Sequence, residues 1–234
     1  LMEQGPLYMQ TIEPPLRNAE TVQDVLDHPF PDPYAEGRFD DAEKYIDMYK
    51  KDYFIIGDLE LTIYEMSWHM VGMEKFMLDM AMGEDYIGVL LDRVKEFSIG
   101  IGKQLAALGV DAIWAGDDFG AQNGMLISPT MWRELFKPRH AEVFQEIKAA
   151  NPEVMIIYHT DGAVAPIIDD LIEIGVDVLN PVQPNVPGHA PQELKSRFGD
   201  RLSFFGAIDQ QELLPAGTPE EISADVASKI EILG

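Results

Sequence analysis

A histidine and a carboxylate follow one short apolar run of this sequence at a spacing that suits metal binding or proton transfer. His159 and Asp161 lie two residues apart after the run 154–158, so both side chains point the same way if that run is a strand. An imidazole and a carboxylate together can ligate a divalent metal such as zinc, or form a general base with its orienting partner. The alternative is a histidine that makes a local hydrogen bond beside a turn aspartate. The pattern alone leaves these possibilities open.

Two adjacent carboxylates, Asp117 and Asp118, end the apolar run 110–116. Neighbouring residues of a strand face opposite ways, so we expect one of the two to enter an active site. A carboxylate there can stabilise a cationic intermediate or move a proton, with its pKa set by its neighbours. The alternative is a helix or loop cap. We predict that the catalytic residues are Asp117, Asp118 and His159.

Polar side chains also end the other apolar runs, and an aromatic pair follows the first of them. Strand ends meet solvent and are commonly polar, so a single one of these carries little weight, whereas the whole set favours a functional site. In the segment 64–82, most apolar side chains are expected to pack a helix, but Tyr64, Trp68 and His69 follow a strand end and can also wall a pocket for a planar ligand. The predicted substrate-binding residues are Glu60, Tyr64, Trp68, Asn180, Gln183 and Asp209.

The elements that must position these residues are short strands alternating with helices. The strands are continuous apolar runs rather than alternating ones, as expected for parallel strands buried on both faces. Strands that alternate with helical patterns imply βα units and a parallel sheet. A doubly wound sheet is the main rival, but the sequence lacks a glycine-rich phosphate loop. The predicted strands are 53–58, 110–116, 154–158, 176–179 and 202–205.

Length and composition favour one domain spanning residues 1–234. The chain is 46% apolar, which suffices for one sizeable core. Residues 1–50 are rich in proline and acidic side chains, and we expect an irregular excursion with helices over 19–27 and 36–50. The later helices are expected to break near Gly83 and again near Pro138. At Pro138 the reason is that proline kinks or breaks a helix.

The charge balance restricts the class of partner. The net charge of −24 argues against broad contact with nucleic acid or anionic membranes, and no apolar run reaches the length of a membrane span. The absence of cysteine excludes disulfides and thiolate metal sites within this sequence. We therefore expect a cytoplasmic protein that acts on a small molecule.

Seven short segments of the sequence form a recognisable series. They are Gly-Asp-Asp-Phe-Gly at 116–120, Leu-Ile-Ser-Pro at 126–129, Trp-Arg-Glu at 132–134, Lys-Pro-Arg at 137–139, Tyr-His-Thr-Asp-Gly at 158–162, Gly-Val-Asp-Val-Leu-Asn-Pro-Val-Gln at 175–183 and Phe-Gly-Ala-Ile-Asp at 205–209. Together these segments resemble the uroporphyrinogen decarboxylase superfamily. The resemblance covers nearly the whole chain in the order of the family, and it is specific for the superfamily rather than for one activity.

The resemblance implies an α/β fold of the (β/α)8 TIM-barrel type, incomplete in this segment because the first two strands and the last strand are missing. It also implies a homodimer. Members of the superfamily either decarboxylate uroporphyrinogen without a cofactor or transfer methyl groups with the help of a corrinoid protein. In the methyltransferases a His-x-Cys motif and a later cysteine hold zinc.

Here His159 matches the family histidine, whereas Asp161 stands where the motif has cysteine. An aspartate can also ligate zinc or another divalent metal, so His159 and Asp161 are the predicted metal ligands. The segment 57–62 is acidic, which is unfavourable for a substrate that carries many carboxylates. We therefore expect methyl transfer from a small methylated compound to a corrinoid or thiol acceptor. The alternatives are uroporphyrinogen decarboxylation in porphyrin biosynthesis, with no cofactor, and a non-catalytic binding scaffold.

Overall fold

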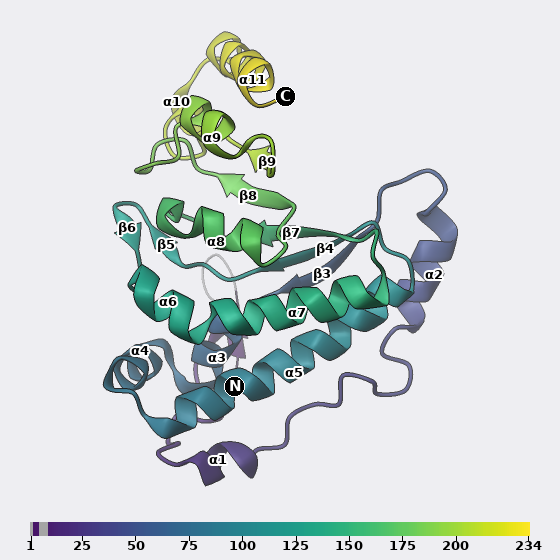
Figure 1. Cartoon of the computed structure of the whole chain (residues 1–234), viewed down its shortest axis with the longest axis vertical. Helices are drawn as coiled ribbons and strands as arrows, with labels where there is room; N and C mark the ends of the chain where they lie inside the picture. Colours follow the sequence, from purple (N-terminus) through teal and green to yellow (C-terminus); the bar gives the residue numbers. More distant parts are fainter. Residues whose placement is uncertain (1, 5–8) are drawn as a thin grey trace.

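The computed structural model describes residues 2–4 and 9–234 of the chain. Its centre is a five-stranded sheet in which neighbouring strands are all parallel and follow one another in the order β3-β4-β7-β8-β9 (Figure 1). Each strand therefore pairs with the strands that precede and follow it in this series, as in a segment of a βα barrel. The strands are β3 (Ile56–Glu60), β4 (Ala112–Gly116), β7 (Met155–His159), β8 (Val178–Val182) and β9 (Ser203–Gly206).

Helices connect the strands and cover one face of the sheet, with α5 and α7 lying side by side across it (Figure 1). The predicted α/β class with parallel strands is confirmed, whereas the strands predicted to be missing stay a prediction. The helices after β3 are α3 (Tyr64–Val71), α4 (Met73–Met82) and α5 (Asp85–Ala107); those after β4 are α6 (Pro129–Leu135) and α7 (Lys137–Ala150); the rest are η1 (Ala165–Ile167), α8 (Ile168–Glu173), α9 (Pro191–Phe198), α10 (Leu213–Ala216) and α11 (Pro219–Leu233).

The N-terminal stretch holds a small hairpin and two helices before the sheet begins. Strands β1 (Met2–Gln4) and β2 (Met9–Thr11) pair antiparallel. Helices α1 (Val22–Leu26) and α2 (Asp40–Tyr49) lie within the ranges predicted for them. Residues 1 and 5–8 of the predicted domain and excursion lie outside the described part of the chain.

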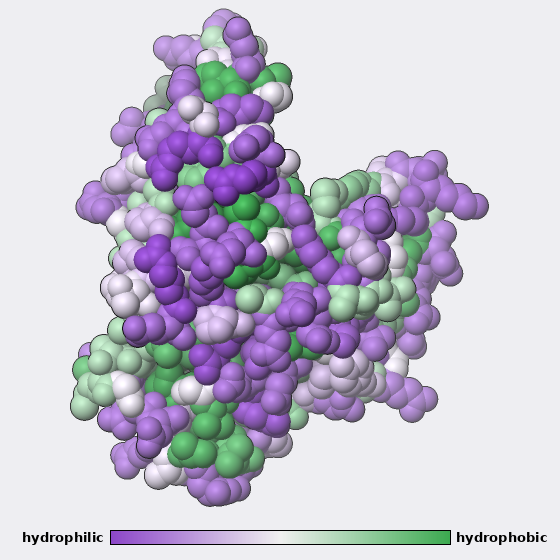
Figure 2. Space-filling model, in the orientation of Figure 1, coloured by the Kyte–Doolittle hydropathy of each residue, from purple (hydrophilic) through white to green (hydrophobic). Residues whose placement is uncertain are grey.

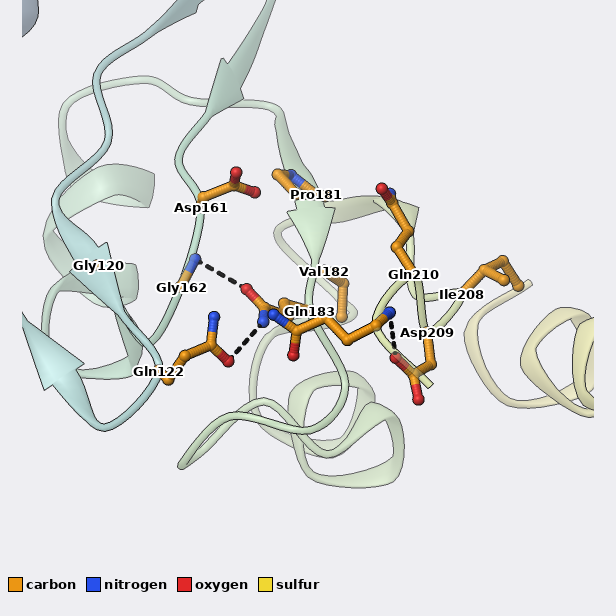
Figure 3. A pocket seen from close by; sticks show the side chains of 11 residues that line it. Gly120, Gln122, Asp161, Gly162, Pro181, Val182, Gln183, Ile208, Asp209 and Gln210 are labelled. Atoms are coloured by element: carbon orange, nitrogen blue, oxygen red, sulfur yellow. Dashed lines mark hydrogen bonds between the residues drawn. The ribbon is translucent and has the colours of Figure 1, made fainter. Parts of the chain in front are cut away.

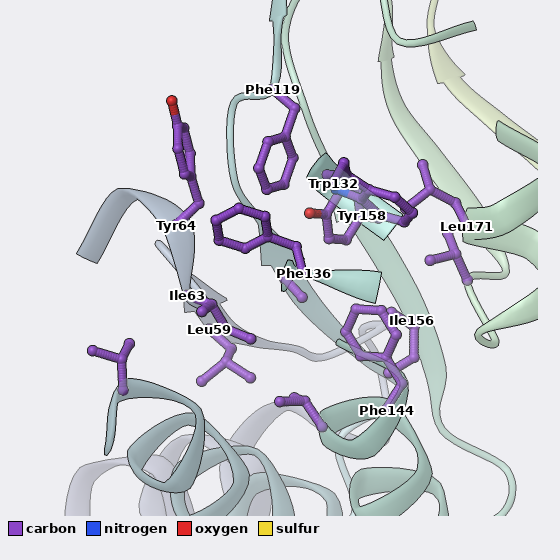
Figure 4. Close-up of a cluster of buried hydrophobic side chains, with 14 of the residues drawn as sticks. Leu59, Ile63, Tyr64, Phe119, Trp132, Phe136, Phe144, Ile156, Tyr158 and Leu171 are labelled. Atoms are coloured by element: carbon purple, nitrogen blue, oxygen red, sulfur yellow. The ribbon is translucent and has the colours of Figure 1, made fainter. Parts of the chain in front are cut away.

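The core lies between the sheet and its covering helices, and it is rich in aromatic rings (Figure 4). Phe119 packs against both Tyr64 and Phe136, with ring centroids 4.7 and 5.1 Å apart. Trp132 and Tyr158 are fully buried in the same cluster. Large buried rings contribute much of the apolar area that stabilises a domain of this size. This cluster fixes the helices against the carboxyl ends of β4 and β7.

The predicted break near Pro138 is confirmed, and it separates α6 from α7. Ser128 caps α6 by accepting a hydrogen bond from the Met131 N–H at 3.1 Å, and Pro129 occupies the first helical turn. Pro138 lies in the first turn of α7, where it removes no intrahelical hydrogen bond. The bend at Phe136 allows both helices to bury apolar side chains.

Two local predictions were incomplete. The helical segment 64–82 breaks at Gly72, which has φ +100°, as well as after α4 at Gly83, which has φ +75°. The first strand begins at Ile56 instead of residue 53, because Ile56, which is paired with Ala112, is the first residue of β3 that pairs with β4. Tyr53 and Phe54 consequently lie exposed before the strand.

The opposite face of the sheet carries exposed apolar side chains at Ile56, Met155 and Phe205. In a closed βα barrel this inward face is filled by side chains from all strands. The remaining surface is largely hydrophilic on the face shown in Figure 2, in keeping with the net charge of −24. Among the described helices, none is long and apolar enough to cross a membrane.

Candidate active site

The candidate site lies at the carboxyl ends of β3, β4, β7 and β8. Glu60 pairs with Gly116, Gly116 with His159, and His159 with Asn180. Paired residues of parallel strands share a face, so the three side chains project from the same face of the sheet. In barrels of this kind, functional side chains come from this end of the strands.

Gly116 has no side chain, and this allows the neighbouring strand β7 to place His159 close to β4. A Cβ at Gly116 would lie 2.4 Å from the His159 carbonyl oxygen and 2.7 Å from the His159 Cβ. Such contacts are too short for any other residue without movement of the backbone. The glycine therefore allows β4 and β7 to approach closely where the imidazole emerges.

Three side chains converge into a group that is able to hold a metal ion. One ligand atom from each of Asp118, His159 and Asp161 lies within 4.8 Å of the others. His159 Nε2 is 3.7 Å from Asp118 Oδ1 and 3.8 Å from Glu60 Oε1. The arrangement offers one nitrogen and several oxygens, a mixed set that suits zinc, manganese or iron.

The imidazole of His159 is held in a defined orientation. Its Nδ1 donates a hydrogen bond to Asn180 Oδ1 at 2.8 Å, and Asn180 Nδ2 in turn donates to the Phe205 carbonyl oxygen at 3.4 Å. The Trp114 ring stacks on the imidazole at a centroid distance of 5.7 Å. Because Nδ1 carries the proton, the lone pair on Nε2 faces the carboxylates. Asn180, predicted to bind substrate, thus contacts the histidine directly.

Asp117 and Asp118 face opposite ways, as expected. Asp117 is fully buried and accepts hydrogen bonds from the N–H groups of Ile63 and Glu65, with a shortest distance of 2.9 Å, and from His140 Nε2 at 3.0 Å. Its carboxylate therefore caps the start of α3 and ties that helix to α7. The structure places Asp117 behind the site, so it positions other residues instead of contacting a ligand. Asp118 is the member of the pair that enters the site.

Glu65 is a site residue that sequence reasoning missed. Its Oε2 accepts a hydrogen bond from the Asp118 N–H at 3.2 Å. Burial, followed by repulsion from Asp117 and Asp118, raises the pKa of the Glu65 carboxyl to about 8. Burial also raises the pKa of Asp118. Glu65 follows Glu60 by five residues, but it reaches Asp118 only because Asp117 accepts hydrogen bonds from the N–H groups of Ile63 and Glu65.

The two aromatic residues predicted to wall a pocket differ in burial: Tyr64 is fully buried, whereas Trp68 is partly exposed. Tyr64 is buried in the core, where its hydroxyl donates to Met77 Sδ at 3.1 Å and burial raises its pKa to about 12. Trp68 stacks on His69 with ring centroids 3.8 Å apart. Asp117 accepts hydrogen bonds from the N–H groups at the start of α3, and Tyr64 in that turn packs in the core instead of lining a pocket. The substrate-binding role predicted for Trp68 stays a prediction.

Gln183 and Asp209 do line a cavity, which opens beside Asp161 and has a volume of about 180 Å³ (Figure 3). The cavity lies at the ends of β7, β8 and β9, and the hairpin formed by β5 (Gly120–Ala121) and β6 (Gly124–Met125) closes one side. The hairpin was not predicted, because its two-residue strands carry no apolar run.

The hairpin lies directly against the segment that carries Asp161. A Cβ at Gly120 would lie 2.3 Å from the Asp161 carbonyl oxygen, and one at Gly162 would lie 2.4 Å from the Gly120 carbonyl carbon. Gly162 also has φ +79°, a conformation that favours glycine. The two glycines thus allow backbone contact that fixes both the cavity wall and the Asp161 carboxylate.

Comparison with known proteins places this chain in a family. Its fold is of the α/β class, with a parallel βα sheet that is consistent with part of a βα barrel. The family model for uroporphyrinogen decarboxylase (URO-D) matches residues 10–233. The chain therefore belongs to the uroporphyrinogen decarboxylase family.

Two relatives extend the comparison. A methylated-thiol–coenzyme M methyltransferase of Methanosarcina mazei is 24% identical over 154 residues, which is 66% of this chain and 39% of the relative. A solved structure described as a methyltransferase from Methanosarcina mazei superposes on 99% of this chain and 66% of its own, with a TM-score of 0.71 and 20% identity. At that identity the superposition supports the shared fold alone. The chain thus spans less than two thirds of both relatives.

Proposed function

We propose that this protein transfers a methyl group from a small methylated compound to a corrinoid or thiol acceptor, assisted by a divalent metal ion. The observation that carries the proposal is the convergence of Asp118, His159 and Asp161 at the strand ends. The family membership and the methyltransferase relatives support this class of reaction. The corrinoid would be carried by a partner protein.

The residues present fit a metal ion of intermediate hardness. His159 would ligate through Nε2, because Asn180 occupies Nδ1, and Asp161 and Asp118 would each supply a carboxylate oxygen. Asp118 Oδ1 accepts a hydrogen bond from the Asp161 N–H at 2.7 Å, and this contact holds the two acidic residues together. When bound, such an ion acts as a Lewis acid toward the heteroatom that bears the methyl group or toward a thiol acceptor.

The proposal is tested first by metal affinity. Zinc titration by calorimetry of the purified protein is expected to show one site, with affinity reduced about 100-fold or more in His159→Ala and Asp161→Asn. Asp200→Asn is a matched control for Asp161→Asn, because the Asp200 side chain is 81% exposed and lies before the amino end of β9, whereas the site is at the carboxyl ends of the strands. Failure of the wild-type protein to bind zinc, manganese or iron would contradict the metal-assisted reaction.

A second experiment separates methyl transfer from decarboxylation. Incubation with uroporphyrinogen is expected to yield no coproporphyrinogen, because Asp58 and Glu60 lie exposed at the edge of the site and repel a polycarboxylate. Methylation of a free corrinoid, supplied in its chemically reduced Co(I) state, by methylated thiols or ethers is expected, and the conversion of Co(I) to methyl-Co(III) is followed by the absorbance of the corrinoid. Coproporphyrinogen formation without corrinoid methylation would replace the proposal with the decarboxylase alternative.

A further inference from the structure

The cavity beside Asp161 has an unusual lining for so small a space. Four of the described residues around it are glutamines, and none is lysine or arginine. The glutamines are Gln122, Gln183, Gln210 and Gln211. Since Asp161 belongs both to the cavity wall and to the proposed metal site, a molecule bound here lies next to that site (Figure 3).

Hydrogen bonds fix the direction of two of these amides. The Gly162 N–H donates to Gln183 Oε1 at 3.1 Å, so the oxygen of that amide is its acceptor end. Gln183 Nε2 then donates to Gln122 Oε1 at 3.0 Å. The series ends at Gln122 Nε2, whose N–H groups have no partner among the described residues. The cavity thus presents amide donors whose orientation is set by the backbone at Gly162 (Figure 3).

The charge at the cavity is negative. Asp209 accepts hydrogen bonds from the N–H groups of Gln211 and Glu212 at 2.9 and 3.2 Å and from Asn185 Nδ2 at 2.8 Å. The backbone hydrogen bonds lower the pKa of Asp209, so its carboxylate keeps its charge. Asp161 adds a second carboxylate. An anionic ligand would meet these charges with no described cationic side chain to offset them.

We propose that this cavity binds the uncharged, hydrogen-bonding part of the methyl donor and that Gln122 and Gln183 determine this specificity. The substrate class is then a small neutral methylated compound with an amide, hydroxyl or ether group, while carboxylates of the same shape are rejected. The identification of the ligand as a methyl donor rests on the proposed function. The preference for a neutral ligand is a property of the cavity and is measured by binding, without turnover.

The test uses two methyl ethers of nearly the same shape, methoxyacetamide and methoxyacetate. Binding is measured by ligand-observed NMR titration of EDTA-treated protein, so that no contact between the carboxylate and a metal contributes. The amide is expected to bind about tenfold more tightly than the carboxylate or better. Gln122→Lys is expected to lose or reverse this preference, because it places a cation at the exposed tip of the hairpin. Gln145→Lys, an exposed position on α7, is the control with the same change in charge and is expected to behave as wild type.

The outcomes separate this inference from the proposed function. Equal or tighter binding of methoxyacetate, binding of neither compound, or an unchanged preference in Gln122→Lys would overturn the inference, even if methyl transfer is observed. A clear preference for the amide that Gln122→Lys abolishes would support it, even if no methyl transfer occurs. In that case the cavity would serve a different reaction of a neutral substrate.

Discussion

His159 presents Nε2 to a group of carboxylates because its other ring nitrogen, Nδ1, makes a hydrogen bond to Asn180. This single contact sets the tautomer and the orientation of the ring. The same carboxylates depend on residues behind them: Asp117 holds the start of α3, and Glu65 contacts the Asp118 backbone. At the scale of the residue, the site is therefore defined as much by the partners of the candidate ligands as by the ligands themselves.

Replacement of Asn180 tests this dependence. Asn180→Leu is expected to lower zinc affinity about 10- to 100-fold, because the His159 ring loses its acceptor and samples other orientations. Asn180→Asp retains an oxygen in the same place and is expected to keep affinity near that of wild type. Calorimetric zinc titration of the two variants checks the prediction. Equal loss in both, or in neither, would show that the contact does not orient His159.

The elements around the site differ in how far the sequence predicts them. Continuous apolar runs predicted the strands, and Ser128 with Pro129 marked the start of α6, because these signals are local. The hairpin at 120–125 and the contact between Glu65 and Asp118 escaped prediction, because both depend on how distant segments pack. Of the predicted site residues, His159, Asp161 and Asp118 converge, since strand ends of a parallel sheet meet at one edge. Tyr64 does not join them, because it is buried in the core. The sequence could not predict this, since an aromatic residue in the first turn of a helix can face either the core or the site.

The close contact between the hairpin and the Asp161 segment leads to a prediction at the scale of the element. Gly162→Ala is expected to destabilise the protein by about 3 kcal/mol, because the Cβ strains a positive φ and also collides with the hairpin. Gly83→Ala is the matched control: its φ of +75° is similar to the +79° of Gly162, but nothing lies within 4 Å of its Cβ position. The control is expected to lose only about 1 kcal/mol. Urea unfolding of both variants measures the difference, and equal losses would argue against the collision.

At the scale of the whole molecule, the sheet has two open edges, β3 and β9, and one face with exposed apolar side chains. A closed (β/α)8 barrel has neither feature. The chain also spans only part of its relatives. The five parallel strands correspond to part of a barrel wall, and the candidate site residues come from neighbouring strands of that wall.

Acid is expected to destabilise the whole molecule through His189, which is fully buried. Its Nε2 accepts the Val164 N–H at 3.1 Å, and burial lowers its pKa from 6.5 to about 4. Between these values the unfolded chain binds a proton that the folded protein excludes, so stability falls as pH drops from 6.5 to 4. The difference amounts to about 3 kcal/mol.

Urea unfolding at pH 7 and pH 4.5 checks this prediction. His189→Gln keeps an acceptor for the Val164 N–H and is expected to lose most of this part of the pH dependence. His28→Gln, on the loop after α1, is the control and is expected to retain it. A pH dependence that is the same in His189→Gln and wild type would show that another group is responsible.

The central claim, a metal site built on His159, is tested most directly by anomalous diffraction from crystals of the zinc-loaded protein. We predict one strong peak about 2 Å from His159 Nε2 and from carboxylate oxygens of Asp161 and Asp118. The peak should be absent in His159→Ala crystals prepared in the same way. A zinc ion bound elsewhere, or one at the strand ends without contact to His159, would contradict the account.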